Sequence, residues 1–336
     1  MIHLAERSID GLRAWIAGDP HPVLLDGGLS TQLHGTDISG PLWTARAIMQ
    51  EPERVRQAHM QFLQAGAEIL ITGSYQMSRE GFLRAGYQAI QAEEALRTSV
   101  RLAREAIAEA MECATPSAIP GQRHSQRRTP LVAASIGPYG AILHDGSEYR
   151  GGYDLSPGQL RSFHLQRIEI LAEAQPDLLV CETIPDLREV EVLLAALTEF
   201  AHLATTVSCT VRDDRYVSAG QPIEALAEVV SPQVIALGVN CCAPELVPAL
   251  LQRLREHTAL PLIAYPNAGG TWDAPSEQWI TGSGTALQGS FGVAQLADLT
   301  SPPVDLIGGC CGTDAGDIAD LRRSLRPRSG GQTPLR

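Results

Sequence analysis

The chain has 336 residues, of which 44% are apolar and 19% charged, so a large core is available and global disorder is not expected. Its formal net charge of −12 argues against a surface that binds nucleic acid or an anionic membrane, because such surfaces are positive. The sequence contains no lysine, which excludes Schiff-base chemistry, a pyridoxal-phosphate lysine and a Walker-type phosphate loop.

Localisation is predicted from what the sequence lacks. No stretch approaches the ~20 apolar residues of a membrane span, and the charged N-terminal residues lack the apolar block of a secretory signal. The seven cysteines do not form the dense pattern of a small secreted domain. We therefore expect a cytoplasmic protein with reduced thiols and with neither nucleic acid nor membrane as a partner.

Eight short segments, apolar or β-branched, are predicted to be strands. In chain order they are 22–28, 68–76, 131–140, 177–183, 205–211, 234–241, 261–267 and 304–311. Most lack a two-residue alternation, as expected for strands buried on both faces of a parallel sheet. Helical patterns lie between them, several beginning at Pro or at a Ser or Asp cap. They are 52–66, 93–114, 158–175, 186–201, 222–230, 244–257, 290–299 and 315–325.

This alternation predicts an α/β protein with a (β/α)8 TIM-type barrel, formed as a single domain by residues 1–325. A doubly wound sheet is the alternative, but the turn after the first strand lacks the GxGxxG spacing of a dinucleotide site. The Pro-, Ser- and Arg-rich stretch 115–129 is predicted to be a solvated insertion on the face away from the reaction site. Residues 326–336 are predicted to be a disordered tail.

Three cysteines fall at the ends of predicted strands, and these ends form the reaction face of a barrel. Cys241 ends the sixth strand, whereas Cys310 and Cys311 end the eighth. Because neighbouring residues in a strand point to opposite faces, the chain must turn for both Cys310 and Cys311 to serve one centre. Glycines that permit such a turn are Gly308, Gly309 and Gly312. Three converging thiolates predict a zinc site whose fourth tetrahedral position is left for a substrate.

For any single cysteine the alternative is packing, since a free cysteine is commonly a small buried apolar residue. We interpret Cys113, Cys181, Cys209 and Cys242 in that way. A disulfide between the adjacent members of the GGCC segment is a further alternative, but it would be strained and rare in a reducing compartment.

Sequence blocks along nearly the whole chain carry a resemblance. They are LLDGGLSTQL (24–33), PLWTARAI (41–48), ILITGSYQ (69–76), ASIGPYGAILHDGSEYRGGY (134–153), CETIPDLREVE (181–191), ALGVNC (236–241), YPNAGGTWD (265–273) and LIGGCCGT (306–313). Together they resemble the zinc-dependent homocysteine S-methyltransferase family, most closely its stand-alone members that use S-methylmethionine. The family's two zinc motifs, GxNC and GGCC, fall on the three cysteines named above.

The resemblance implies a substrate and the residues that hold it. In this family homocysteine binds with its sulfur as the fourth zinc ligand, and the metal keeps that thiol deprotonated. The resemblance further implies that Asp26 and Glu182 hold the amino group, and that backbone amides around Gly27 and Gly28 face the carboxylate. Asp26 alone is equally compatible with a simple turn, and Glu182 alone with a buried acid paired with an arginine.

The methyl donor implied by the resemblance is a sulfonium, S-methylmethionine or S-adenosylmethionine. A cation of this kind favours aromatic faces, and the candidates near the reaction face are Trp43, Tyr75, Tyr139 and Tyr265, with packing as the alternative for each. Trp43 and Tyr75 are the primary donor-side candidates. Two other hypotheses stay open: the same zinc and homocysteine site with betaine or methyltetrahydrofolate as donor, and a non-catalytic zinc- or thiol-binding protein.

Overall fold

The computed structural model describes residues 8–19, 21–33, 42–113, 128–229, 231–268, 271–273, 278–280 and 304–325, and its centre is a ring of eight parallel strands. The strands are β1 (Val23–Leu24), β2 (Ile69–Ile71), β3 (Leu131–Ile136), β4 (Leu178–Ile184), β5 (Thr205–Cys209), β6 (Val234–Asn240), β7 (Leu262–Tyr265) and β10 (Leu306–Ile307). They pair in the order β1-β10-β7-β6-β5-β4-β3-β2. A parallel bridge between Leu25 and Ile69 joins the end strands, so the sheet closes and the predicted barrel is confirmed.

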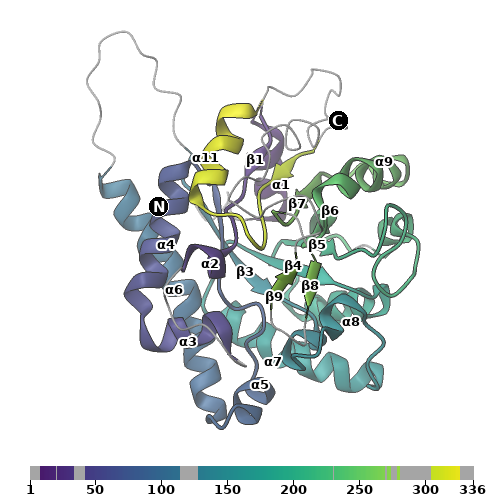
Figure 1. Cartoon of the computed structure of the whole chain (residues 1–336), viewed down its shortest axis with the longest axis horizontal. Coiled ribbons are helices and arrows are strands. Elements are labelled where there is room, and N and C mark those ends of the chain that lie inside the picture. The colour runs from purple at the N-terminus through teal and green to yellow at the C-terminus, as the bar shows by residue number, and fades with distance from the viewer. Residues whose placement is uncertain are drawn as a thin grey trace.

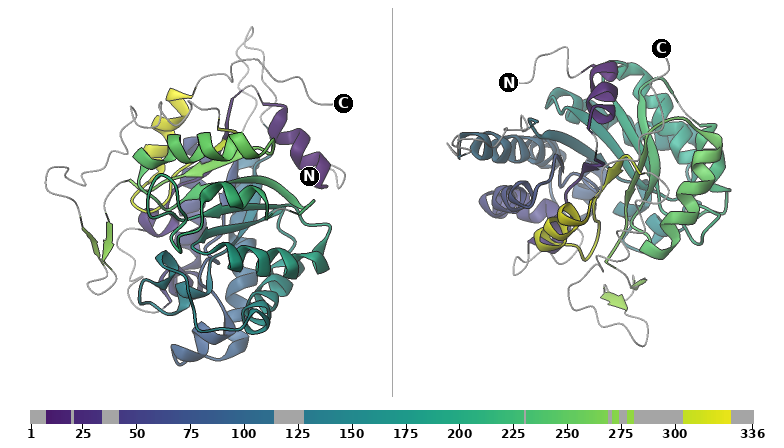
Figure 2. Two further views of the ribbon diagram at one scale, coloured as in Figure 1. Left: turned by 90° about the vertical axis from the view of Figure 1, so that its right-hand side faces the viewer. Right: turned by 90° about the horizontal axis from the view of Figure 1, so that it is seen from above.

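Helices surround the strands (Figures 1 and 2). The α-helices are α1 (Ile9–Ala17), α2 (Leu29–Gln32), α3 (Trp43–Gln50), α4 (Pro52–Ala65), α5 (Arg79–Arg84), α6 (Ala89–Cys113), α7 (Pro157–Glu173), α8 (Leu187–Leu197), α9 (Val247–His257) and α11 (Ala315–Ser324). Short 3-10 helices are η2 (Tyr139–Ile142), η3 (Ser147–Tyr149), η4 (Thr198–Phe200), η5 (Ile223–Ala227) and η6 (Pro244–Leu246). A separate antiparallel pair consists of β8 (Thr271–Asp273) and β9 (Gln278–Ile280).

The core has two layers, which explains why the strands read as continuous apolar runs. Leu24 and Val132 belong to the larger apolar cluster between the strands and the helices. Val23 and Leu25 belong to a second cluster, which fills the inside of the barrel. Successive residues of a strand point to opposite faces, and here both faces are buried, so no polar alternation is needed.

Helix α1, which the sequence analysis did not predict, packs against the barrel interior. It begins at Ser8, whose hydroxyl accepts a hydrogen bond from the amide of Gly11. Leu12 and Ile16 are each 2% exposed and belong to the same cluster as the inward-facing strand residues. They contribute apolar surface to the interior, while the polar and cysteine side chains gather at the carboxyl ends of the strands.

Most predicted helices are present, with three differences. The segment 222–230 forms only the 3-10 helix η5, so the prediction of an α-helix there was wrong. Helix α6 begins at Ala89, four residues earlier than predicted, and α2, α3 and α5 were not predicted. The predicted helix 290–299 lies outside the described residues, as do the tail 326–336 and all but two residues of the insertion 115–129.

Among the described residues, no helix is both long enough and apolar enough to cross a lipid bilayer. Apart from the β8–β9 pair, the described residues between 8 and 325 contribute to one barrel and its surrounding helices. The exact extent of the domain, 1–325, stays a prediction.

Candidate active site

The three cysteines predicted to converge do so. Cys241 directly follows β6, Cys310 and Cys311 follow β10, and both strands pair with β7. The sulfur atoms of Cys241 and Cys311 are 3.7 Å apart, and those of Cys310 and Cys311 are 4.0 Å apart. All three sulfur atoms lie within 4.8 Å of one another. The barrel thus brings together residues that are 70 positions apart in the sequence.

This cluster has the dimensions of a tetrahedral zinc site. With zinc–sulfur distances of about 2.3 Å, two ligands of a tetrahedron are about 3.8 Å apart, close to both sulfur–sulfur distances in this cluster. Three protein thiolates leave one ligand position, and all three cysteines line a common cavity. The donor set therefore fits zinc with room for a substrate sulfur.

Local backbone conformation aims the three side chains at one point. Cys241 adopts φ 49°, in the left-handed region that non-glycine residues rarely enter, while its amide donates to the carbonyl of Tyr265. The turn after Cys311 uses Gly312 at φ 82°, as the sequence analysis expected of a glycine there. Gly309 was also expected to permit the turn, but its φ is not positive, so that prediction was wrong. A Cβ at Gly309 would overlap Thr313, so the glycine instead allows close packing.

Electrostatics within the cluster favour one thiolate. The thiols of Cys310 and Cys311 hydrogen-bond to Cys241 and hold its pKa well below the usual value, and Tyr149 and Asn267 act in the same direction. The hydroxyl of Tyr149 lies 3.3 Å from the sulfur of Cys241. Tyr149 and Asn267 were not among the predicted site residues; each lies inside a quoted sequence block but carries no motif of its own.

The remaining cysteines lie elsewhere. Cys181, Cys209 and Cys242 are buried in the apolar core, as predicted. Cys113 is exposed at the end of α6, so its interpretation as a core residue was wrong. An amphipathic helix of this length has one solvent face, and its last residue lies on that face.

Glu182, in β4, is 7% exposed and lines the cavity. Its carboxylate accepts hydrogen bonds from Ser135 and Tyr265, yet burial raises its pKa to about 7. Among the described residues no arginine pairs with it, which removes the arginine-paired alternative considered for this glutamate.

Asp26 follows β1 and contacts β2, and it is not among the described residues that line the cavity. It is 1% exposed, and one carboxylate oxygen accepts a hydrogen bond of 2.8 Å from the amide of Ile71. Its other carboxylate oxygen, Oδ1, has no hydrogen-bond partner among the described residues. Burial, with a smaller contribution from the negative charge of Glu182, holds the pKa of Asp26 well above its usual range. A buried unpaired oxygen of this kind is more than a simple turn requires.

Gly27 and Gly28 both line the cavity. The amide of Gly28, however, donates to the carbonyl of Thr313 at 3.0 Å and to its hydroxyl at 3.2 Å. The Gly28 amide is thus already engaged within the chain, whereas the contact expected of the Gly27 backbone stays a prediction. The engagement of Gly28 is tertiary, because Thr313 follows the cysteine pair and folds back onto the first strand.

Asn240, which was not a predicted site residue, precedes Cys241 and holds the cavity-lining residue Thr183. Its Oδ1 accepts hydrogen bonds from the amide of Thr183 and the hydroxyl of Ser208, while its Nδ2 donates to the hydroxyl of Thr183. These bonds hold Thr183 at φ 59°, at the point where the β4–β5 register shifts. The strained backbone turns Thr183 into the cavity lining.

The cavity measures about 130 Å³ and has room for a small molecule. Of the predicted aromatic residues, Trp43, Tyr75 and Tyr265 line it. Trp43 is the first residue of α3, with φ 35°, and its ring lies 6.3 Å from that of His144. Tyr139 does not line it.

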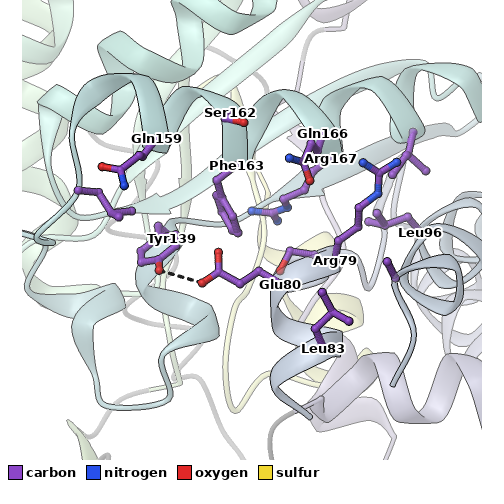
Figure 3. Close-up of a pocket in the computed structure, with 14 residues that line it drawn as sticks. Arg79, Glu80, Leu83, Leu96, Tyr139, Gln159, Ser162, Phe163, Gln166 and Arg167 are labelled. Atoms are coloured by element: carbon purple, nitrogen blue, oxygen red, sulfur yellow. Dashed lines mark hydrogen bonds between the residues drawn. The ribbon is translucent and has the colours of Figure 1, made fainter. Parts of the chain in front are cut away.

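Tyr139 instead borders a second cavity of about 540 Å³ on the helical shell, shown in Figure 3. Its hydroxyl donates to Glu80, and its ring packs edge-on against Phe163 with centroids 4.9 Å apart. The prediction that Tyr139 faces the reaction site was wrong, because β3 ends at Ile136 and the chain turns outward into η2.

Arg167, labelled in Figure 3, connects this outer layer to the site. It is 1% exposed and donates to the carbonyls of Gly137 and Tyr75. The guanidinium lies over the ring of Phe163, and burial lowers its pKa to about 10. Gly137 in turn leaves the space that the Tyr75 ring occupies, since a Cβ there would overlap that ring. Arg167 thus fixes the backbone that carries Tyr75.

Comparisons with known proteins agree with this geometry. A family model described as homocysteine S-methyltransferase matches residues 23–325. The homocysteine S-methyltransferase of Escherichia coli (strain K12) is 40% identical over 308 residues, which are 89% of this chain and 94% of that protein. The homocysteine S-methyltransferase YbgG of Bacillus subtilis (strain 168) is 37% identical, covering 92% of this chain and 97% of that protein.

Among solved structures, the metallated form of the homocysteine methyltransferase MmuM from Escherichia coli superposes with a TM-score of 0.79. It is 37% identical and covers 93% of this chain and 99% of that one. The apo form of the same enzyme gives a TM-score of 0.71. The extent and level of this similarity show that the chain belongs to the homocysteine S-methyltransferase family.

Proposed function

We propose that the protein is a zinc-dependent homocysteine S-methyltransferase that takes its methyl group from a sulfonium donor and forms methionine. The observation that carries the proposal is the cluster of Cys241, Cys310 and Cys311 beside the buried carboxyl of Glu182 in one small cavity. A cytoplasmic location, which keeps thiols reduced, suits such a site.

The three cysteines would hold the zinc ion, as their sulfur–sulfur spacing supports. When bound, zinc lowers the pKa of a thiol at its fourth position and keeps that thiol as a nucleophilic thiolate at neutral pH. Tyr149, 3.3 Å from the sulfur of Cys241, restricts the orientation of that ligand side chain. No general base is needed from the chain, so the histidines require no catalytic role.

Glu182 and Asp26 are proposed to bind the ammonium group of homocysteine. Both carboxyls are buried, and Asp26 Oδ1 has no partner within the described residues. A cationic ligand stabilises the ionised form of each acid, which burial alone disfavours. The backbone around Gly27, which lines the same cavity, is the remaining candidate contact for the substrate carboxylate.

The donor is proposed to bind beside Trp43 and Tyr75, whose aromatic rings suit a sulfonium cation. In the reaction, the homocysteine thiolate attacks the methyl carbon and a new carbon–sulfur bond forms. The carbon–sulfur bond of the donor breaks, and its electron pair stays on the donor sulfur, which becomes a neutral thioether. Holding the two sulfur atoms and the methyl group in line supplies much of the rate acceleration.

The test is methionine formation by zinc-loaded protein from homocysteine and, in separate reactions, S-methylmethionine, S-adenosylmethionine, betaine and methyltetrahydrofolate. We expect turnover with the sulfonium donors, and loss of turnover after chelation that returns when zinc is restored. Turnover with betaine or the folate alone would contradict the donor assignment. No methionine from any donor would leave a zinc- or thiol-binding protein as the better interpretation.

A further inference from the structure

The described side chains that line the cavity beside the cysteine cluster are acidic or neutral. Among the described residues that line it, none is an arginine or a histidine, whereas two carboxyls and three thiols face it. Apart from the metal position, this lining favours positively charged groups of a ligand. One carboxyl is Glu182, used above for the acceptor, and the other is Glu148.

Glu148 is buried, and within the described part of the chain no basic side chain forms an ion pair with it. It lies in η3, is 6% exposed, and its Oε2 makes no hydrogen bond with any described residue. The nearest basic side chain in sequence, Arg150, is exposed and turns instead to Ser147 and Asp145. Burying an unpaired carboxylate costs free energy. We therefore expect the Glu148 carboxylate to interact with a positively charged group of a bound ligand.

Close packing holds Glu148 at the cavity. A Cβ on Gly140 would overlap the backbone amide of Glu148, so η2 and η3 pack more closely than a larger residue would allow. Tyr149, the next residue, reaches Cys241, and the aromatic donor-side candidates Trp43 and Tyr75 line the same cavity. Glu148 thus faces the same space as the cluster but comes from a different element than Glu182, whose carboxyl already accepts from Ser135.

We propose that Glu148 is the counter-charge for the sulfonium of the methyl donor and is a specificity-determining residue of the reaction. The inference rests on the proposed function. A sulfonium has no N–H to donate, so it is recognised by a carboxylate not engaged in hydrogen bonds together with aromatic faces. Its charge disappears when the methyl group leaves, so the attraction is strongest for the bound donor and weakens toward the neutral thioether.

This assignment predicts how kinetic constants change in Glu148→Gln, which keeps the shape and removes the charge. An interaction that is stronger in the bound ground state than in the transition state contributes to KM and not to kcat. We expect the KM for S-methylmethionine to rise about tenfold or more, with kcat unchanged or higher. Zinc content and affinity for homocysteine should stay at the wild-type level. Glu182→Gln is the matched control. It should lower the affinity for homocysteine and leave the KM for S-methylmethionine unchanged.

A binding experiment separates charge from shape. The probes are S-methylmethionine and its uncharged carbon isostere, 2-amino-5-methylhexanoic acid, titrated calorimetrically into wild type and Glu148→Gln. We expect wild type to prefer the sulfonium and the variant to lose that preference. A dimethylsulfonium carboxylate without an amino group should lose affinity in the variant by the same factor as S-methylmethionine.

Several outcomes would overturn the proposal. They are an equal loss of affinity for charged and uncharged probes, a loss confined to probes with an amino group, a loss of homocysteine affinity, and no change at all. If wild type uses sulfonium donors and the variant is unchanged, the inference fails while the proposed function stands. If wild type makes no methionine from any sulfonium, both fail. Thermal unfolding supplies a folding check, since removing an unpaired buried charge should raise the Tm of the ligand-free protein.

Discussion

At the scale of single residues, the cysteine cluster combines an unusual backbone with sulfur atoms in near contact. Cys241 holds a left-handed φ, and its sulfur lies 3.7 Å from that of Cys311. A non-glycine residue in this conformation is strained by about 1 kcal/mol or more, and such strain concentrates at functional sites. The strain is consistent with a side chain placed for metal binding and not for packing.

Replacing Cys311 tests the ligand assignment. We expect Cys311→Ser to lose zinc and methyltransferase activity while the barrel stays folded, because a serine hydroxyl replaces one of three thiolates. Metal analysis after gel filtration, with circular dichroism as the folding check, measures the effect. The matched control is Cys242→Ala, which removes a core thiol and should keep zinc. Full zinc stoichiometry in Cys311→Ser, or zinc loss in Cys242→Ala, would show that the wrong cysteines were assigned.

Glu182 is the second residue whose role can be tested alone. Glu182→Gln removes a charged partner of the substrate ammonium, an interaction worth about 1.5–3 kcal/mol, so homocysteine affinity should fall roughly tenfold to a hundredfold. Calorimetric titration of zinc-loaded protein with homocysteine measures this. Zinc content should stay unchanged, since no cysteine is altered. An unchanged affinity would mean that Glu182, through Ser135 and Tyr265, has a purely structural role.

At the scale of elements, the outer helices fix the geometry of the inner site. Helix α7 was predicted from its sequence as residues 158–175, and the structure adds the Ser156 cap with Pro157 in the first turn. The sequence did not reveal that Arg167 on this helix reaches inward to the carbonyls of Gly137 and Tyr75. A single arginine in a helix reads as a solvated side chain, and only the packing of α7 on the barrel buries it.

Arg167→Met tests this connection. The carbonyls of Gly137 and Tyr75 would lose their charged donor, and we expect a loss of about 2–4 kcal/mol in the free energy of unfolding. We also expect a higher KM for the donor with homocysteine affinity retained, because Tyr75 is the residue displaced. Urea denaturation and donor kinetics measure the two effects. The control is Arg161→Met. Arg161 lies on α7 like Arg167 but forms an exposed ion pair with Glu199, so its loss should change the free energy of unfolding by under about 1 kcal/mol. A variant as stable as wild type with an unchanged donor KM would disprove the connection.

At the scale of the whole molecule, buried titratable groups make stability depend on pH. His59, in α4, is fully buried, and neither ring nitrogen has a hydrogen-bond partner among the described residues. Burial lowers its pKa from 6.5 to about 4. The unfolded chain therefore takes up a proton near pH 6.5 that the native protein takes up only near pH 4, so stability falls as the pH drops between these values.

His59→Leu should reduce this acid sensitivity. Between pH 7 and pH 4, the free energy of unfolding of wild type should fall by up to about 3 kcal/mol more than that of the variant. The size of this difference follows from the lowered pKa of His59 in the native state. Urea titrations across the pH range measure the difference, and a substitution of the exposed His202 serves as control. Equal pH dependence in wild type and His59→Leu would contradict the assignment.

The sequence by itself determined the barrel, the strand positions and the convergence of three cysteines. Apolar runs of strand length and the helical period are local properties, and in a closed parallel barrel the carboxyl ends of all strands meet at one face. The matching sequence blocks added the substrate class. The resemblance also assigned Gly27 and Glu182 to the substrate and offered Trp43 and Tyr75 as donor-side candidates, and all four line the cavity.

Only the tertiary structure decided which of these residues meet, and by what contacts. The engagement of the Gly28 amide by Thr313, the outward turn that removes Tyr139, and the unpaired carboxyl of Glu148 depend on partners far away in the chain. Hydrogen-bond partners and buried charge are properties of pairs and cavities, which a one-dimensional pattern does not encode. They become defined only when the closed barrel brings its loops to a single face.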